Sequence, residues 1–209
     1  MHHHKPSPPT CLPGFEHVNR YWDRHHNTFA AKILPGEYYV TTGQEVITTV
    51  LGSCISVCVY DPVQGIGGMN HFMLPSSRKD DMGLLSESFR YGDVAMERLV
   101  NDLLRNGADK SRLIFKAFGG GQIIKHMTAI GQRNISFLHK FMTMEGYKLK
   151  ASDLGGPHPR KVVFFPLEGS VKVKRLQHMH NDTIVARENK YSTQLSKQEE
   201  ITGDIDLFD

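Results

Sequence analysis

A cysteine and a histidine stand on the two sides of a predicted chain reversal, and together they could perform nucleophilic chemistry. Cys54 directly follows Gly52 and Ser53, and His71 lies beyond the segment DPVQG at 61–65. A neighbouring imidazolium lowers the pKa of a thiol, and the resulting thiolate attacks acyl carbons. We therefore expect a Cys-His site in which the backbone N–H groups at Gly52 and Ser53 point at a developing oxyanion.

The geometry of the reversal supports this pairing. Pro62 presets the backbone angle of a turn. Because opposed residues of an antiparallel hairpin have residue numbers with a constant sum, a reversal centred between Pro62 and Val63 places Cys54 opposite His71. Their Cβ atoms would then lie about 4.5 to 5.5 Å apart. The alternative is that Cys54 is a small buried apolar residue and His71 a satisfied core histidine, and the pattern leaves both interpretations open.

The other cysteines and histidines predict neither a disulfide nor a metal site. If residues 55–60 are extended, Cys54 and Cys58 lie about 13 Å apart, which exceeds the roughly 7 Å limit for a disulfide. We interpret Cys58 as core packing and Cys11 as an exposed thiol. A zinc site needs close cysteine or histidine pairs, whereas the chain offers C-x3-C and an isolated H-x-H at 178–180. We predict no metal and no other cofactor.

Composition limits the class of protein. The chain has 209 residues, of which 39% are hydrophobic and 22% charged, as expected for one ordinary globular core. No apolar run reaches the roughly 18 residues of a membrane span, and the N-terminus lacks a secretory signal, so we expect a cytoplasmic protein without membrane insertion. The net charge is +3 with dispersed Lys and Arg, which does not favour nucleic acid binding.

Extended and helical segments alternate in the middle of the chain. Apolar residues at helical spacing predict helices over 91–106 and 135–145, with Asn134 as N-cap of the second. Strands are predicted over 37–41, 55–60, 67–74, 112–118, 147–151, 161–165 and 170–175. This pattern favours an α/β layered sandwich with a mostly antiparallel or mixed β-sheet packed by helices.

The two ends of the chain differ from this middle region. Residues 1–32 are rich in His and Pro, including His2–His4, and we expect a flexible extension there. Residues 179–209 are polar with scattered Ile and Leu, which is typical of a solvated tail. The predicted catalytic domain therefore spans residues 33–178.

Several collinear motifs resemble the chemoreceptor glutamine deamidase family, CheD. The resemblance covers about residues 37–176 and includes most of the predicted strands. The matching segments are TTVLGSC at 48–54, DP at 61–62, GGxxH at 67–71, LP at 74–75, RYxD at 90–93, AFGGG at 117–121, IGxRN at 130–134 and DLGG at 153–156 with a later Arg160.

This resemblance implies an enzyme that converts glutamine side chains of methyl-accepting chemotaxis receptors to glutamate without a cofactor. The family's Cys-His-Thr site, similar to that of the cytotoxic necrotising factor deamidases, would consist of Cys54 as nucleophile, His71 as base and later acid, and Thr48 as the residue that orients the imidazole. Thr48 matches because it stands six residues before the cysteine. The resemblance also implies binding to a phosphatase of the chemotaxis response regulator.

The mechanism predicts an open site, because the target is a side chain on a protein surface. We expect the rim of this site, which binds the substrate or the oxyanion, to include Gly119, Gly120, Arg133 and Asn134, although tight turns needed by the fold explain these residues equally well. Two other functions stay open. The chain could be mainly a non-catalytic partner of the phosphatase, or a transglutaminase or peptidase that uses the same thioester chemistry.

Overall fold

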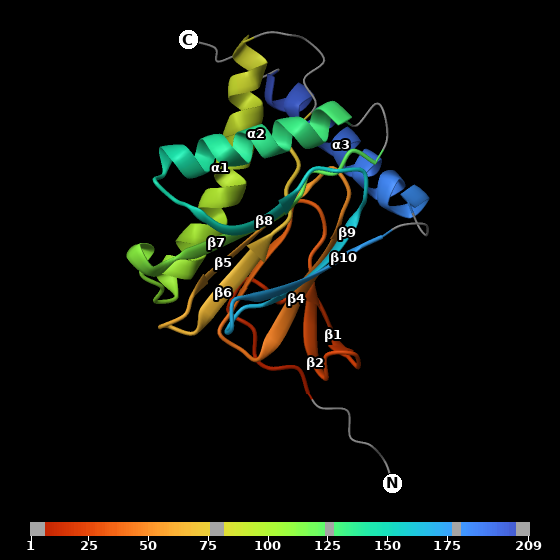
Figure 1. Cartoon of the computed structure of the whole chain (residues 1–209). Helices are drawn as coiled ribbons and strands as arrows, with labels where there is room; N and C mark the ends of the chain where they lie inside the picture. The colour runs from red at the N-terminus through yellow and green to blue at the C-terminus, as the bar shows by residue number, and fades with distance from the viewer. Residues whose placement is uncertain (1–6, 76–81, 124–127, 177–180, 204–209) are drawn as a thin grey trace.

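Two five-stranded β-sheets form the centre of the computed structural model (Figure 1), which describes residues 7–75, 82–123, 128–176 and 181–203. The first sheet has the order β1 (Asn19–Asp23), β2 (Thr28–Lys32), β4 (Glu45–Leu51), β9 (Arg160–Phe165) and β10 (Ser170–Arg175). The second has the order β3 (Tyr38–Thr41), β6 (Ile66–Asn70), β5 (Ile55–Asp61), β7 (Ile114–Gly119) and β8 (Leu149–Leu154). In each sheet one strand pair is parallel, β2 with β4 and β7 with β8.

Three helices accompany the sheets. They are α1 (Met82–Arg105), α2 (Thr128–Met144) and α3 (Asn181–Gly203), and a short 3-10 turn spans Lys110–Arg112. Helix α1 packs on β3 and β6, and α2 contacts α1 and β5. Figure 1 places α3 at the same end of the molecule as α2, away from the N-terminus. The predicted α/β fold of mixed sheets packed by helices is confirmed.

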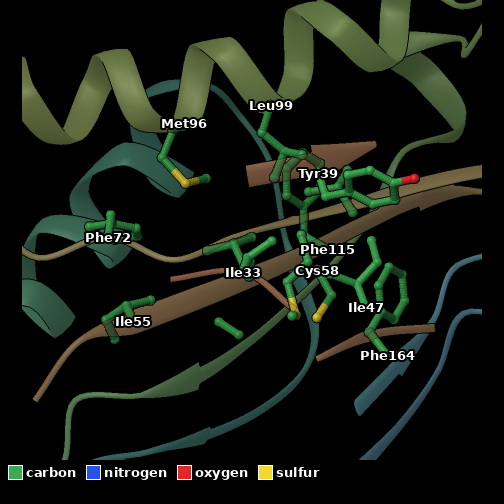
Figure 2. Packing of buried hydrophobic residues seen from close by; sticks show 14 of the residues in the cluster. Ile33, Tyr39, Ile47, Ile55, Cys58, Phe72, Met96, Leu99, Phe115 and Phe164 are labelled. Atoms are coloured by element: carbon green, nitrogen blue, oxygen red, sulfur yellow. The ribbon is translucent and has the colours of Figure 1, made fainter. Parts of the chain in front are cut away.

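One buried cluster joins the two sheets and α1. Strands of the first sheet contribute Ile47 and Phe164, and strands of the second contribute Cys58 and Phe115. Figure 2 shows Cys58 among these side chains, with Met96 and Leu99 projecting from α1 toward the strands. The prediction that Cys58 serves core packing is confirmed, because its side chain is fully buried. No described helix is both long and apolar enough to cross a membrane.

The seven predicted strands all exist, but three further strands were missed. β1 and β2 lie within the segment predicted as a flexible extension, and their pairing is supported by an edge-to-face contact between Trp22 and Phe29 with ring centroids 5.2 Å apart. Phe15 and Val18 enter the main core. The predicted boundary at residue 33 is therefore wrong for the described residues from 7 onward, while His2–His4 lie outside the described residues.

Both predicted helices also exist but begin earlier than expected. The second predicted helix, α2, starts at Thr128, so Asn134 lies inside it and is not its N-cap. The prediction of a solvated polar tail over residues 179–209 is likewise wrong for the described part, because α3 occupies 181–203. Its spacing of Ile184, Tyr191 and Leu195 gives it one inward face.

The β5–β6 hairpin has a different register from the predicted one. Asp61 pairs with Ile66, so the reversal is centred between Val63 and Gln64 rather than one residue earlier. The same register continues to the bridge between Ile55 and Phe72. It would set Met73, not His71, opposite Cys54. His71 is instead a diagonal neighbour of Cys54, which is still within reach of a side chain.

Asp61 anchors this hairpin through a buried charge. Its carboxylate accepts hydrogen bonds from the N–H groups of Val63, Gln64 and Asp109, and it pairs with Arg112 at 2.8 Å. The Arg112 guanidinium holds the pKa of Asp61 well below its ordinary value. Since the folded-state pKa is lowered, this stabilisation is complete above the unfolded pKa of about 3.9 and is lost as the pH falls below it.

We expect Asp61→Asn to lower the free energy of unfolding by about 3 kcal/mol at pH 7, because an amide leaves Arg112 and several N–H groups without an anionic acceptor. Urea unfolding at pH 7 and at pH 3 measures this, and the difference from the wild type should shrink at the lower pH. Glu145→Gln is the control, since its pair with Lys110 is exposed and its loss should change the free energy of unfolding far less. Equal losses in the two variants would contradict the assignment.

Candidate active site

Cys54 and His71 meet at the ends of their strands. Cys54 ends the short link between β4 and β5, and His71 directly follows β6. The Cys54 sulfur, a ring nitrogen of His71 and a carboxylate oxygen of Glu188 all lie within 4.8 Å of one another. The structure therefore brings together the predicted cysteine and histidine. It adds Glu188 from α3, which the sequence analysis did not identify.

Thr49 fixes the orientation of the imidazole. Its hydroxyl lies 2.8 Å from Nδ1 of His71 and also donates a hydrogen bond to the carbonyl of Ile33 at 2.8 Å. A hydroxyl has one proton to donate, so at His71 it must accept from Nδ1–H. The other ring nitrogen, Nε2, then carries a lone pair, and it has no hydrogen-bond partner among the described residues. An unpaired basic nitrogen beside a thiol is what a general base requires.

Thr48, which was predicted to orient the imidazole, does not contact it in the structure. The Thr48 hydroxyl donates to the carbonyl of Val162 on the neighbouring strand at 2.9 Å. Side chains alternate along β4, and Thr49 shares the inward face with Ile47, whereas Thr48 shares the opposite face with Val46. The expected contact is wrong by one residue, because apolar side chains occupy both faces of this strand and conceal which face is inward.

Burial favours the uncharged forms of both the cysteine and the histidine. Burial raises the pKa of the Cys54 thiol well above its ordinary value, and the nearby Glu188 carboxylate raises it further. Burial lowers the pKa of His71 to about 3, with a smaller contribution from Arg187. Burial therefore disfavours a resting thiolate–imidazolium pair in this arrangement. An uncharged pair would transfer the thiol proton to Nε2 during the reaction itself.

The link before Cys54 forms a cradle of hydrogen-bond donors. The N–H groups of Gly52 and Ser53 each donate to the Glu188 carboxylate at 2.8 Å, and the N–H of Cys54 donates at 3.3 Å. The Ser53 hydroxyl adds a fourth bond at 2.7 Å. Gly52 leaves room for this approach, because a Cβ atom there would lie 2.7 Å from a Glu188 oxygen. The N–H groups of Gly52 and Ser53 thus point at a carboxylate of the same chain, and their role toward a developing oxyanion stays a prediction.

The glycine run at 119–121 holds the cradle in place rather than lining it. The N–H of Gly120 donates to the Cys54 carbonyl and that of Gly121 to the Gly52 carbonyl, both at 2.7 Å. Gly119 pairs with Ile55 in the sheet. These contacts favour the alternative interpretation, in which Gly119 and Gly120 form a turn needed by the fold, and their predicted place in a substrate-binding rim stays a prediction.

Asn134 and Arg133, both on α2, each donate a hydrogen bond to a backbone carbonyl near the site. The Asn134 amide donates to the Ser53 carbonyl at 2.8 Å and accepts from the Leu74 N–H at 2.9 Å. Arg133 donates to the Pro75 carbonyl at 2.7 Å. Asn134 is fully buried in this arrangement, as Cys54 is, and its predicted contact with a substrate stays a prediction. Its role is to join α2 to the link that carries the cysteine.

We expect Gly119→Ala to displace the nucleophile. The added Cβ atom would lie 2.1 Å from the Cys54 carbonyl oxygen, and residue 119 has a φ of +113°. The variant should lose about 2 to 4 kcal/mol in the free energy of unfolding, through overpacking and backbone strain. Chemical denaturation measures this. Gly65→Ala is the control, since its φ is +65° with nothing within 4 Å of the added atom, and should lose about 1 kcal/mol. Similar losses would show that the contact at Cys54 is unimportant.

The same three side chains must be considered as a metal site. Cysteine, histidine and glutamate all ligate zinc, and the donor atoms of Cys54, His71 and Glu188 are close together. The surroundings fit an anion better. Three backbone N–H groups and a hydroxyl converge on the carboxylate, and such donors repel a cation while they stabilise negative charge.

The site is closed, in contrast to the predicted open surface. Cys54 has no exposed surface and His71 is 1% exposed. Glu188 reaches the cradle from α3, and its own side chain is buried as well. A glutamine of another protein cannot contact the sulfur in this arrangement. With α3 in place, we expect Cys54 to be less reactive toward alkylating agents than the partly exposed Cys11.

Comparison with known proteins shows the family of this chain. The family model described as CheD chemotactic sensory transduction matches residues 73–175. The chain is 49% identical over 202 residues to a protein of Hahella chejuensis (strain KCTC 2396), covering 96% of this chain and 95% of that protein. It is 50% identical over 204 residues to one of Halorhodospira halophila (strain DSM 244 / SL1), covering 96% and 94%.

A third relative, from Methylobacillus flagellatus, is 49% identical over 194 residues, which is 91% of this chain and 95% of that protein. All three relatives are named probable chemoreceptor glutamine deamidase CheD. The matched region covers more than nine tenths of this chain in each of these comparisons. The protein therefore belongs to the CheD family.

Proposed function

We propose that this protein deamidates glutamine side chains on the cytoplasmic helices of methyl-accepting chemotaxis receptors, with Cys54 as nucleophile and His71 as general base and acid. One observation carries this proposal. The N–H groups of residues 52–54 bind a glutamate side chain beside the thiol and the imidazole. Glutamate is the product of glutamine deamidation, so the site already accommodates the chemical group that the reaction generates.

The first half of the reaction forms a thioester. Nε2 of His71 takes the thiol proton as the Cys54 sulfur attacks the glutamine side-chain carbonyl carbon. The carbonyl oxygen becomes an oxyanion, and the N–H groups of residues 52–54 are placed to stabilise it. His71 then gives its proton to the amide nitrogen, and the C–N bond breaks to release ammonia.

The second half restores the enzyme. His71 takes a proton from a water molecule, whose oxygen attacks the thioester carbon and forms a second oxyanion in the same cradle. The C–S bond breaks and the sulfur regains a proton from His71. The net change is addition of water and loss of ammonia, which converts a neutral amide to a carboxylate. No metal or organic cofactor enters any of these steps.

Thr49 supports this chemistry as a positioning residue. By accepting from Nδ1–H it holds the tautomer in which Nε2 faces the reaction, and a wrong tautomer would remove the base. The comparable Cys-His-Thr site of the cytotoxic necrotising factor deamidases and a cytoplasmic location belong to the same proposal. So does an association with a response-regulator phosphatase, for which the family resemblance is the only support.

The test is incubation with purified cytoplasmic fragments of chemoreceptors from the same organism. Peptide mass mapping should find particular glutamines converted to glutamate, with release of ammonia. Addition of a primary amine distinguishes a transglutaminase, which would incorporate the amine in place of water. Unchanged fragments, with the protein folded, would favour the alternative that the chain is mainly a binding partner of the phosphatase.

A further inference from the structure

Helix α3 presents one face to the active site. The inward positions are Ile184, Glu188, Tyr191 and Leu195, which recur at the spacing of one helix face. Ile184, Glu188 and Leu195 are at most 4% exposed. The Tyr191 hydroxyl is hydrogen-bonded to that of Tyr91 on α1. The helix is thus seated by its apolar residues, with one charged side chain at the centre of the face.

That charged side chain closes the catalytic site. Both oxygens of Glu188 are bound by the cradle, and a carboxylate oxygen lies within 4.8 Å of the Cys54 sulfur and of a His71 nitrogen. The carboxylate also fills the space that a Cβ atom of Gly52 would need. With the helix in this position, His71 and Cys54 are both buried. Substrate entry therefore requires that Glu188 leaves.

We infer that α3 is a built-in occupant of the substrate site, in which Glu188 takes the place of the product side chain and the helix takes the place of the receptor helix that carries it. This inference rests on the proposed function. The match is chemical as well as spatial, because the proposed product is a glutamate on a helix, and Glu188 is a glutamate on a helix. A receptor helix must displace α3 to reach Cys54, so the helix competes with the substrate.

The carboxylate suits the cradle better than an amide does. Each Glu188 oxygen accepts from at least one backbone N–H, at Gly52 or at Ser53. An amide would direct an NH2 group at one of these donors, which weakens binding. Glu188→Gln should therefore loosen α3 while it presents a substrate group to the nucleophile, tethered on the same chain and hence at high effective concentration.

The first experiment is self-deamidation. In purified Glu188→Gln, peptide mass mapping over time should show residue 188 converting to glutamate, by the same thioester steps and with release of one ammonia per chain. Adding Cys54→Ala should preserve the glutamine. Two controls lie on the outward face of α3: the native Gln194 and a glutamine introduced by Asn189→Gln. Both should persist as glutamine.

Receptor fragments distinguish a failure of the inference about α3 from a failure of the proposed function. If the introduced amide at position 188 persists while the same preparation deamidates receptor fragments, α3 is not a substrate-like occupant, and the inference fails while the proposed function stands. If neither this amide nor the receptor fragments change in a folded protein, the proposed function fails as well. Conversion at position 188 that survives Cys54→Ala would show spontaneous hydrolysis and also contradict the inference.

The second experiment measures release of α3. Glu188→Ala should raise the rate of Cys54 alkylation by iodoacetamide, and the initial rate of receptor deamidation, by at least about tenfold, because several charge-assisted hydrogen bonds to the cradle are lost. Asn189→Ala, an exposed neighbour, should change neither rate. Cys58 is an internal standard and should stay unlabelled, since its labelling would indicate general unfolding. Unchanged Cys54 alkylation in Glu188→Ala, or an increase matched by Asn189→Ala, would overturn the inference.

Discussion

Replacement of Cys54 by alanine should lower the rate of receptor deamidation by at least about 10⁴-fold, because removal of a nucleophile from a covalent mechanism leaves only binding and oxyanion stabilisation. Cys54 stands beside the imidazole and within the cradle of N–H donors, so no other described thiol can take its place. Peptide mass mapping of receptor fragments under initial-rate conditions measures the rate of glutamate formation.

Cys58→Ala is the matched control. Cys58 is as completely buried as Cys54 but lies in the core between the sheets, and burial raises the pKa of its thiol far above the ordinary value. The variant should lose about 1 kcal/mol of stability through the small cavity and retain its deamidation rate. Full activity in Cys54→Ala, or a comparable loss of activity in Cys58→Ala with the fold intact, would contradict the covalent mechanism.

The elements that carry strong local signals could be predicted from the sequence. The strand β5 is a mostly apolar run followed by a turn sequence, and the last residues of α1 and α2 are each followed within two residues by a glycine with positive φ, Gly107 and Gly146. These signals depend on neighbouring residues in the sequence, so they can be recognised without knowledge of the tertiary structure. The closeness of Cys54 and His71 followed from the same hairpin, although its register was displaced by one residue at the turn.

The missing elements depend on long-range contacts. β1 and β2 are short strands; β2 pairs with β4 and β1 pairs with β2, and the His-rich turn between them conceals their apolar residues. Among the α3 side chains that the structure describes, Glu188 is the fully buried charged residue, and its partners are 134 to 136 residues away in the sequence. A glutamate within a polar segment is expected to be exposed to solvent, unless the hydrogen-bond donors that bind its carboxylate are known.

The choice between Thr48 and Thr49 as the residue that orients the His71 imidazole also depends on a long-range contact. Thr48 and Thr49 are adjacent, and both hydroxyls are buried and hydrogen-bonded. The alternation of side chains along a strand predicts that the two threonine side chains lie on opposite faces, but it does not predict which face is inward. That choice is made by β9, which pairs with β4 and offers the Val162 carbonyl to Thr48. Sequence spacing to the cysteine contains no information on β9.

Thr49→Val should lower kcat for deamidation by roughly 10- to 1000-fold with little change in KM, since it removes the acceptor that holds the His71 tautomer but leaves the shape of the side chain. Loss of the hydrogen bond to the Ile33 carbonyl should also cost about 1 kcal/mol of stability, which thermal unfolding can report separately. Thr49→Ser retains the hydroxyl and should restore most of the rate.

Thr48→Val provides the comparison, because it removes an equally buried hydroxyl from the opposite face of the same strand. It should reduce stability by a similar amount, about 1 kcal/mol, and leave kcat nearly unchanged. A purely structural role for both residues would give equal kinetic effects. If Thr48→Val instead reduces kcat more than Thr49→Val does, then the imidazole in the working enzyme is oriented by Thr48, and β4 must shift its inward face when α3 leaves the site.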